Sequence, residues 1–242
     1  MARNQVALVV GAGDAIGSSI VRSFARRGLT VCAARRNAER LSPLVEELTA
    51  AGHGAFAYAC DARREDAVEA LFATIERDVG ELSAVVFNVG ANVPMGILET
   101  DSRKFFKIWE MACFAGFLTG REAARYMRPR GRGTIIFTGA TASVRGAAGF
   151  AAFASAKHGR RALAQSMARE LGPRNIHVAH VVIDAAVDTA WIAANVPDAG
   201  KLKAKDGIVD PDALAANYVM LHDQPRNAWT FELDVRPWIE RW

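Results

Sequence analysis

Two short stretches carry residues whose types and spacing could do chemistry. The first is a glycine turn, Gly11-Ala-Gly-Asp-Ala-Ile-Gly17, which follows an apolar run ending at Val10. Glycines between a strand and a helix let the backbone approach a pyrophosphate, and the helix N-terminus offers it unpaired N–H groups. An ordinary strand-to-helix turn is the alternative interpretation. The second stretch, Phe153-Ala-Ser-Ala-Lys157, ends in a lysine. The turn predicts that a dinucleotide contacts Gly11, Gly13, Asp14, Ala15, Ile16 and Gly17.

The residues after the second expected strand indicate which dinucleotide binds. Dinucleotide folds that prefer NAD place an acidic residue there, about 20 positions after the glycines, to hold the ribose 2′-hydroxyl. This chain has Arg35 and Arg36 instead, and guanidinium groups form charge-assisted bonds to phosphates. Asp14 puts a negative charge at the same corner, and two solvated arginines are the alternative interpretation. The pattern favours NADP over NAD.

The elements that must position these residues alternate between strands and helices. Apolar runs predict strands at 6–10, 30–34, 55–59, 82–87, 134–138, 177–183 and 229–233. Helical spacing predicts helices between them, the longest at about 105–127 and 150–171, and a short one that starts at Asp210-Pro211. Residues 185–209 have no clean period and are expected to form a loop or lid. This order predicts one domain with a parallel sheet covered on both faces.

Composition limits the classes of partner. The chain has 242 residues, of which 51% are hydrophobic, and a net charge of +4. No apolar run approaches the roughly 18 residues that span a bilayer, no signal peptide is expected, and basic residues alternate with acidic ones instead of forming a nucleic-acid patch. The cysteines at 32, 60 and 113 fit neither a metal site nor a disulfide framework. We therefore expect a cytoplasmic protein with no metal, nucleic-acid or membrane partner.

Nearly the whole chain resembles a short-chain dehydrogenase/reductase. The family's Thr-Gly-x-x-x-Gly-x-Gly matches Val10–Gly17 with Val for Thr and Ala15 for the middle Gly, and its Asn-Asn-Ala-Gly matches Phe87-Asn88-Val89-Gly90. The resemblance implies further cofactor contacts from Asp61, Ala62, Asn88, Gly90 and Thr189.

The resemblance also implies the architecture. It predicts a three-layer Rossmann-like fold in which a seven-stranded, mostly parallel sheet has helices on both faces. The single NAD(P)-binding domain would cover residues 1–242, with a substrate lid region at 185–222. A homodimer or homotetramer is implied, and the apolar tail 235–242 is expected to pack on the domain or on a neighbouring subunit.

The active-site motif of the family is only half present. Its Tyr-x-x-x-Lys, with a Ser about thirteen positions earlier and an Asn in the preceding helix, maps onto Phe153, Lys157, Ala140 and Cys113. The resemblance implies that Lys157 holds the nicotinamide ribose, whereas the positions that would exchange a proton with the substrate oxygen lack a hydroxyl. Asp184, which stands where the family has a Gly, is a candidate replacement acid or else a loop residue. Tyr218, His222, His177 and His180 are more readily explained by packing.

Two functions remain open from the sequence. The first is an NADP(H)-dependent oxidoreductase that acts on an unknown small molecule with a rebuilt proton-transfer site. The second is a catalytically silent NADP(H)-binding protein that acts as a sensor or as a subunit of an assembly. Both predict cofactor binding, so only turnover distinguishes them.

Overall fold

A seven-stranded parallel sheet forms the centre of the computed structural model, which describes residues 3–90 and 92–241. The strand order is β3-β2-β1-β4-β5-β6-β7, and every neighbouring pair is parallel. The prediction of a seven-stranded, mostly parallel sheet is confirmed, and none of the strand pairs in this sheet is antiparallel. The strands are β1 (Gln5–Val10), β2 (Thr30–Arg35), β3 (Ala55–Ala59), β4 (Glu81–Phe87), β5 (Gly133–Thr138), β6 (Ile176–Ile183) and β7 (Glu232–Val235).

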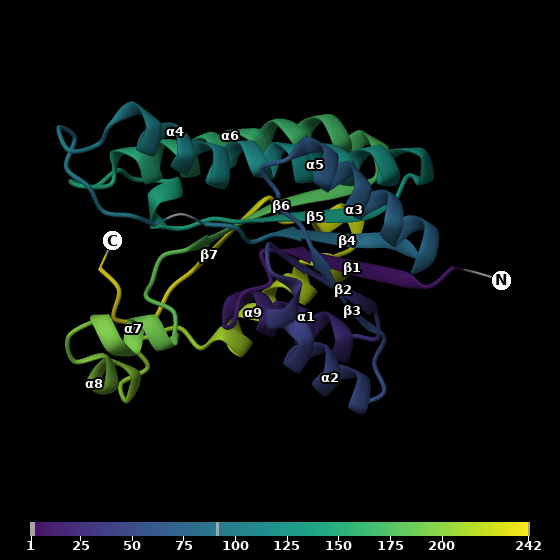
Figure 1. Ribbon diagram of the computed structural model, residues 1–242, viewed down its shortest axis with the longest axis horizontal. Coiled ribbons are helices and arrows are strands. Elements are labelled where there is room, and N and C mark those ends of the chain that lie inside the picture. Colours follow the sequence, from purple (N-terminus) through teal and green to yellow (C-terminus); the bar gives the residue numbers. More distant parts are fainter. Residues whose placement is uncertain (1–2, 91, 242) are drawn as a thin grey trace.

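Helices cover both faces of the sheet, as Figure 1 shows. One face packs against α1 (Ile16–Arg26), α2 (Ser42–Ala50) and α9 (Pro211–Asp223). The other packs against α3 (Glu65–Asp78), α5 (Ala115–Met127) and α6 (Ala151–Leu171), with α4 (Ser102–Trp109) leading into α5. Short 3₁₀ turns occur at Ala38–Leu41, Arg128–Arg130, Thr141–Ser143, Gly172–Arg174 and Arg226–Ala228. Among the described residues, no helix is long and apolar enough to cross a bilayer.

The alternation of side chains along β1 explains why both faces need helices. Val6, Leu8 and Val10 belong to one buried cluster, while Ala7 and Val9 belong to the cluster on the opposite face. A strand buried on both faces reads as a continuous apolar run, which is why the sequence marks it clearly.

Three element boundaries differ from the sequence predictions. The helix expected at 105–127 is two α-helices joined by a π-helical turn at Glu110–Phe114, and a π turn changes the period only locally. The region expected to be a loop at 185–209 contains α7 (Ala190–Asn195) and α8 (Ala199–Lys203). The last strand lies at 232–235 instead of 229–233, because residues 226–228 form a 3₁₀ turn that delays it.

The C-terminal tail packs on the lid region of its own chain. The Trp238 indole N–H donates to the Lys205 carbonyl at 3.0 Å. The side chain of Ile239 lies beside Gly207, where an added Cβ would be 2.4 Å from it. This agrees with the expectation that the tail packs on the domain; Trp242, the last residue of that prediction, lies outside the described residues.

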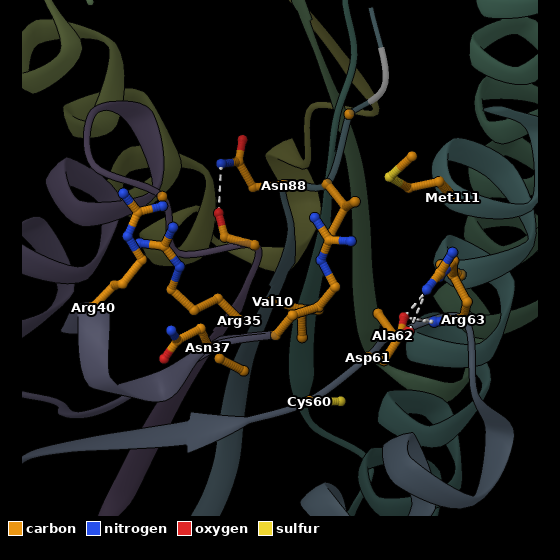
Figure 2. A pocket seen from close by; sticks show the side chains of 17 residues that line it. Val10, Arg35, Asn37, Arg40, Cys60, Asp61, Ala62, Arg63, Asn88 and Met111 are labelled. Atoms are coloured by element: carbon orange, nitrogen blue, oxygen red, sulfur yellow. Dashed lines mark hydrogen bonds and ion pairs between the residues drawn. The ribbon is translucent and has the colours of Figure 1, made fainter. Parts of the chain in front are cut away.

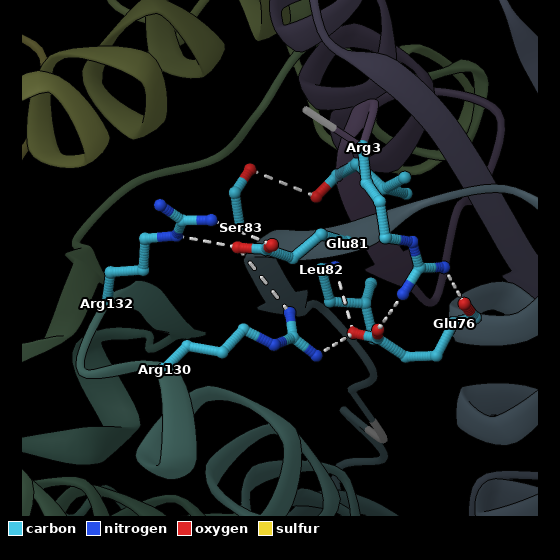
Figure 3. A network of polar contacts seen from close by, with 8 residues as sticks. Arg3, Glu76, Glu81, Leu82, Ser83, Arg130 and Arg132 are labelled. Carbon is cyan, nitrogen blue, oxygen red and sulfur yellow. Dashed lines mark hydrogen bonds and ion pairs between the residues drawn. The ribbon is translucent and has the colours of Figure 1, made fainter. Parts of the chain in front are cut away.

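A network of ion pairs joins the amino ends of the central strands (Figure 3). The buried Glu76 of α3 accepts from Arg130 at 2.6 Å and from the Leu82 backbone N–H at 2.9 Å. Glu81 of β4 accepts both guanidinium bonds of Arg132, at 2.7 and 2.8 Å. Two arginines of the basic run at residues 128–132, Arg130 and Arg132, are therefore paired with carboxylates of the same chain.

Candidate functional site

The glycine turn lies where the strand order reverses. Strand β1 has β2 on one side and β4 on the other, and in open parallel sheets ligands bind beyond the carboxyl ends of strands at such a point. Helix α1 begins at Ile16, and no side chain caps its N-terminus. The positive end of its dipole is thus available to an anion.

Each glycine of the turn has different surroundings, which explain why a side chain is absent at that position. Gly11 has φ +90°, and a Cβ there would lie 2.9 Å from the Asn88 carbonyl carbon. A Cβ on Gly17 would lie 2.5 Å from the Gly11 oxygen, so the turn and the helix start touch directly. A Cβ on Gly13 would meet nothing within 4 Å, which leaves this position facing open space. Gly11 and Gly17 are therefore required by close contacts within the turn, whereas Gly13 leaves open space beside it.

We expect Gly17→Ala to abolish cofactor binding and to lower stability by about 1–3 kcal/mol, because the added methyl overpacks the turn. Gly13→Ala is the matched control. Its methyl has room in the chain, so stability should hold, while a group in the path of the pyrophosphate should weaken NADPH binding. Thermal unfolding and NADPH titration of both variants measure this. A Gly17→Ala protein that melts and binds like the parent would contradict the tight turn.

A cleft of about 670 Å³ opens beside the turn. Its lining residues come from the ends of β1, β2, β3 and β4, from the 3₁₀ turn Ala38–Leu41, from the π turn Glu110–Phe114 and from the start of α5. Figure 2 shows Val10, Arg35, Asn88 and Met111 around this cleft. The predicted residues Gly11, Gly13, Arg35, Arg36, Asp61, Ala62, Asn88 and Gly90 all line it. The structure adds residues that the sequence reasoning missed, which are Asn37, Arg40, Cys60, Arg63 and Met111.

The arginines of the cleft differ in whether they form ion pairs within the chain. Arg35 donates to Asp14 at 2.7 Å, although Asp14 is 74% exposed, and an exposed pair of this kind is weak. Arg36 and Arg40 are exposed, and neither forms an ion pair within the part of the chain that the structure describes. Arg40 lies in the 3₁₀ turn Ala38–Leu41, while Arg36 precedes this turn, so no helical period in the sequence links the two.

Asp61 lines the opposite side of the cleft. Arg63 donates to both of its carboxylate oxygens, at 2.8 and 2.5 Å, and this hydrogen bonding lowers the pKa of Asp61. The carboxylate is therefore a fixed acceptor at the wall of the cleft. Asn88 is fixed as well, because its side-chain amide donates to the Gly11 carbonyl at 3.1 Å.

The three positions without a catalytic hydroxyl or amide lie together in the fold. Phe153 and Cys113 are buried members of one apolar cluster, and Ala140 packs against that cluster. Phe153 is only 6% exposed, and burial raises the pKa of the Cys113 thiol. Ser143, three residues after Ala140, does not replace the missing serine hydroxyl. It is fully buried, and its Oγ accepts the Ala140 N–H at 3.1 Å. The region is apolar where proton transfer would be expected.

Lys157 turns inward beside this cluster. Its Nζ donates to the carbonyls of Thr138 and Gly139 at 3.2 and 3.4 Å, at the carboxyl end of β5. One helical turn later, the fully buried Arg160 donates to Val89 O at 2.7 Å and also to Thr138 O. The sequence reasoning missed Arg160, because a basic residue in an amphipathic helix normally lies on the solvated face.

Asp184 joins three segments in the structure. Its carboxylate accepts from the Thr141 hydroxyl at 2.5 Å and from Arg145 at 3.0 Å, and Arg236 of the C-terminal tail lies 3.8 Å away. Through these contacts Asp184 anchors the loops around the site. Its role as a replacement acid stays a prediction.

The remaining candidates have structural contacts. The Thr189 side chain caps α7 by accepting the Ile192 N–H at 3.1 Å. The Tyr218 hydroxyl is fully buried, 2.8 Å from Thr138 Oγ1. His180 Nδ1 lies 2.9 Å from Glu232, and burial lowers its pKa to about 4. His177 Nδ1 and Nε2 lie 3.0 and 2.9 Å from backbone carbonyls. The interpretation of Tyr218, His177 and His180 as packing residues agrees with their burial, and the cofactor contact of Thr189 stays a prediction.

Comparison with known proteins gives one consistent family. The short chain dehydrogenase family model matches residues 5–198. A 3beta-hydroxysteroid dehydrogenase of Mediterraneibacter gnavus is 32% identical over 188 residues, which are 76% of this chain and 67% of that protein.

Solved structures agree with the family model over nearly the full length. A short-chain dehydrogenase from Rhodopseudomonas palustris is 51% identical, with a TM-score of 0.83 over 98% of this chain and 100% of the other. A metagenomic short-chain oxidoreductase in complex with NADP is 26% identical, with a TM-score of 0.83 over 98% of both chains. The chain therefore belongs to the short-chain dehydrogenase/reductase family.

Proposed function

We propose that the protein is an NADP(H)-dependent oxidoreductase of a small molecule, with a proton-transfer site that differs from that of its family. The observation that supports this best is the cleft beside the glycine turn. It combines an open glycine position, a helix N-terminus and arginines on its wall. These are the features that a dinucleotide with an additional phosphate requires.

The residues of the cleft fit the parts of NADP(H) in order. Gly11, Gly13 and the start of α1 would hold the pyrophosphate, and Arg35, Arg36 and Arg40 would hold the ribose phosphate. Asp61 would contact the adenine, and Thr189, which lies outside the lining of the cleft, would contact the nicotinamide carboxamide. When bound, the cofactor supplies or accepts a hydride. The chain's own residues would orient it and keep water from the reacting carbon.

The missing hydroxyls set a limit on the reaction. A positioned general acid contributes about 10²–10⁴-fold and one oxyanion donor about 10²–10³-fold, and the two losses do not simply multiply. What remains is proximity between hydride donor and acceptor. The structure suits a substrate that is already activated, such as an imine, a quinone or an enone.

The alternative is a silent NADP(H)-binding protein that acts as a sensor or assembly subunit. The specific observation in its favour is the apolar cluster around Phe153, which puts no exposed acid at the family's catalytic position. Binding of the cofactor is common to both proposals.

Two measurements on the purified full chain separate the proposals. Calorimetric titration with NADPH and NADH tests the site, and we expect tighter binding of NADPH. NADPH oxidation with a panel of imines, quinones, enones and carbonyls then tests turnover. Tight NADPH binding with no turnover on any substrate would rule out the enzyme and leave the silent binder, whereas absence of binding would rule out both.

We also propose a homodimer or homotetramer through α4 and α5. Rings of Phe106, Trp109, Phe114 and Phe117 stack in succession along these helices, at centroid distances of 6.0–6.4 Å. Phe106 is 60% exposed and Phe117 38%, and an aromatic surface of this kind suits a second copy of the chain. A monomer by light scattering would contradict this.

The cytoplasmic location remains a proposal, supported by three buried free cysteines.

A further inference from the structure

The ion pair between Asp14 and Arg35 lies where the ribose phosphate of NADP(H) is expected to bind. Arg35 is the last residue of β2 and lines the cleft, and Asp14 directly follows Gly13, which lines it too. Nη1 of Arg35 donates to Oδ1 of Asp14 at 2.7 Å. A carboxylate of the chain therefore occupies one of the guanidinium groups that the proposed function assigns to the phosphate.

The backbone brings these two side chains together. The N–H groups of Gly11 and Ala12 both donate to the Ala34 carbonyl, at 2.9 and 3.1 Å. The glycine turn is thereby fastened to the end of β2. Asp14 and Arg35 follow the two fastened segments closely along the chain, so the fold of the turn itself favours the pair.

Asp14 does not cap the helix that it precedes. A carboxylate at the start of a helix can accept from its first N–H groups, but Ala15 is the N-cap of α1 and no side chain caps this end. The Asp14 side chain contacts Arg35 instead, and 74% of it is exposed. Because the unpaired N–H groups of α1 attract anions, Asp14 is a negative charge beside a site suited to phosphates.

The arginines on this wall of the cleft are of two kinds. Arg36 and Arg40 are exposed and form no ion pair within residues 3–90 and 92–241, whereas Arg35 is paired and its side chain is 19% exposed. Figure 2 shows Arg35 and Arg40 on one side of the cleft and Asp61 on the other. A phosphate would therefore reach the two unpaired arginines directly, but it would have to displace Asp14 from Arg35.

We propose that Asp14 is a specificity-determining residue, which competes with the 2′-phosphate of NADP(H) for Arg35. The inference rests on the proposed function. A phosphate monoester carries up to about two negative charges and three acceptor oxygens, whereas Asp14 offers one charge in an exposed and weak pair. The phosphate displaces the carboxylate, at a cost in affinity. NADH has a hydroxyl in this place, so Asp14 reduces the difference in affinity between the two cofactors.

The test is the variant Asp14→Asn, which keeps the shape of the side chain and removes its charge. We expect the ratio of NADPH affinity to NADH affinity to rise by about 3–10-fold, because one exposed ion pair and one repulsion are lost. Adenosine 2′,5′-bisphosphate, which lacks the nicotinamide half, should gain as much as NADPH does. Calorimetric titration measures all three ligands, and the gain should shrink at high salt.

Asp78→Asn is the matched control. It removes an exposed carboxylate that pairs with Arg77 at 2.7 Å, at the end of α3 and outside the lining of the cleft. The affinity ratio should stay at that of the parent. A ratio that is unchanged in Asp14→Asn, or that rises equally in both variants, would overturn the proposal.

A double-variant cycle tests whether Asp14 acts through Arg35. In an Arg35→Ala background, Asp14→Asn should raise the NADPH preference by less than half as many fold, because the contested group is gone. An equal gain in both backgrounds would overturn the competition. A loss of NADPH affinity in Asp14→Asn would also overturn it, since Asp14 would then hold Arg35 in place for the phosphate.

The binding measurements are independent of turnover. A rise in NADPH preference without turnover on any substrate would support the role of Asp14 and count against the oxidoreductase. Turnover of NADPH with an unchanged preference in Asp14→Asn would do the reverse, so the two failures are distinguishable. Absence of NADPH binding by the parent protein would overturn both proposals.

Discussion

The double variant Phe153→Tyr, Ala140→Ser should gain carbonyl reductase activity. The two positions meet at one apolar cluster next to Lys157, and Phe153 already places a ring where the family has its tyrosine. The new hydroxyls would supply the proton and the second donor that the pocket lacks. We expect the NADPH-dependent reduction of a reactive ketone or aldehyde to rise by about 10²–10⁴-fold.

Phe150→Tyr with Ala140→Ser is the matched control for this gain. Phe150 packs against the same cluster, immediately before α6, but three residues from the family position. This variant has the tyrosine hydroxyl in the wrong place, so its rate should match that of Ala140→Ser alone and lack the gain that the proton donor at position 153 provides. A Phe153→Tyr, Ala140→Ser protein that binds NADPH yet reduces no carbonyl would mean that these positions are not the proton-donating ones.

Replacing Arg35 and Arg36 should have the second largest of the predicted effects, which is a reduced preference for NADPH over NADH. In Arg35→Ala, Arg36→Ala, NADPH affinity should fall by about 10–100-fold, because hydrogen bonds to charged groups contribute about 1.5–3 kcal/mol. NADH affinity should change little, since it has no 2′-phosphate. Titration with both cofactors at low and high salt measures this, and the loss should be larger at low salt.

Arg103→Ala controls for net charge, because Arg103 is exposed on α4 and does not line the cleft. Equal affinity for the two cofactors, unaffected by the double substitution, would exclude phosphate recognition by this pair. Residual preference for NADPH in the double variant would instead point to Arg40, which lines the same wall.

The sequence predicted the central strands of the sheet well because they are buried on both faces. Runs such as Val6–Val10 have one interpretation, and the turn glycines have steric demands that the structure bears out at Gly11 and Gly17. The convergence of Phe153, Ala140 and Cys113 could also be predicted, because the resemblance fixes their spacing.

The errors have local physical causes. The π turn at Glu110–Phe114 has i→i+5 hydrogen bonds in place of the α-helical i→i+4 bonds, and the hydrophobic pattern does not reveal this change. Short helices such as α7 are held by a cap at Thr189 and by tertiary contacts, and not by periodicity. Arg160 was missed because a buried arginine depends on the cavity that Gly116 leaves on another helix, and a distant contact of this kind is invisible along one chain.

The ion pairs of Glu76 and Glu81 lie at the amino edge of the sheet, away from the cleft. They hold α3, β4 and the start of β5 together without using any residue of the cofactor site. Evolution can therefore exchange side chains at the carboxyl edge while the opposite edge preserves the fold. A chain arranged in this way can lose one chemistry and acquire another by a few substitutions, which makes it a practical starting point for directed evolution.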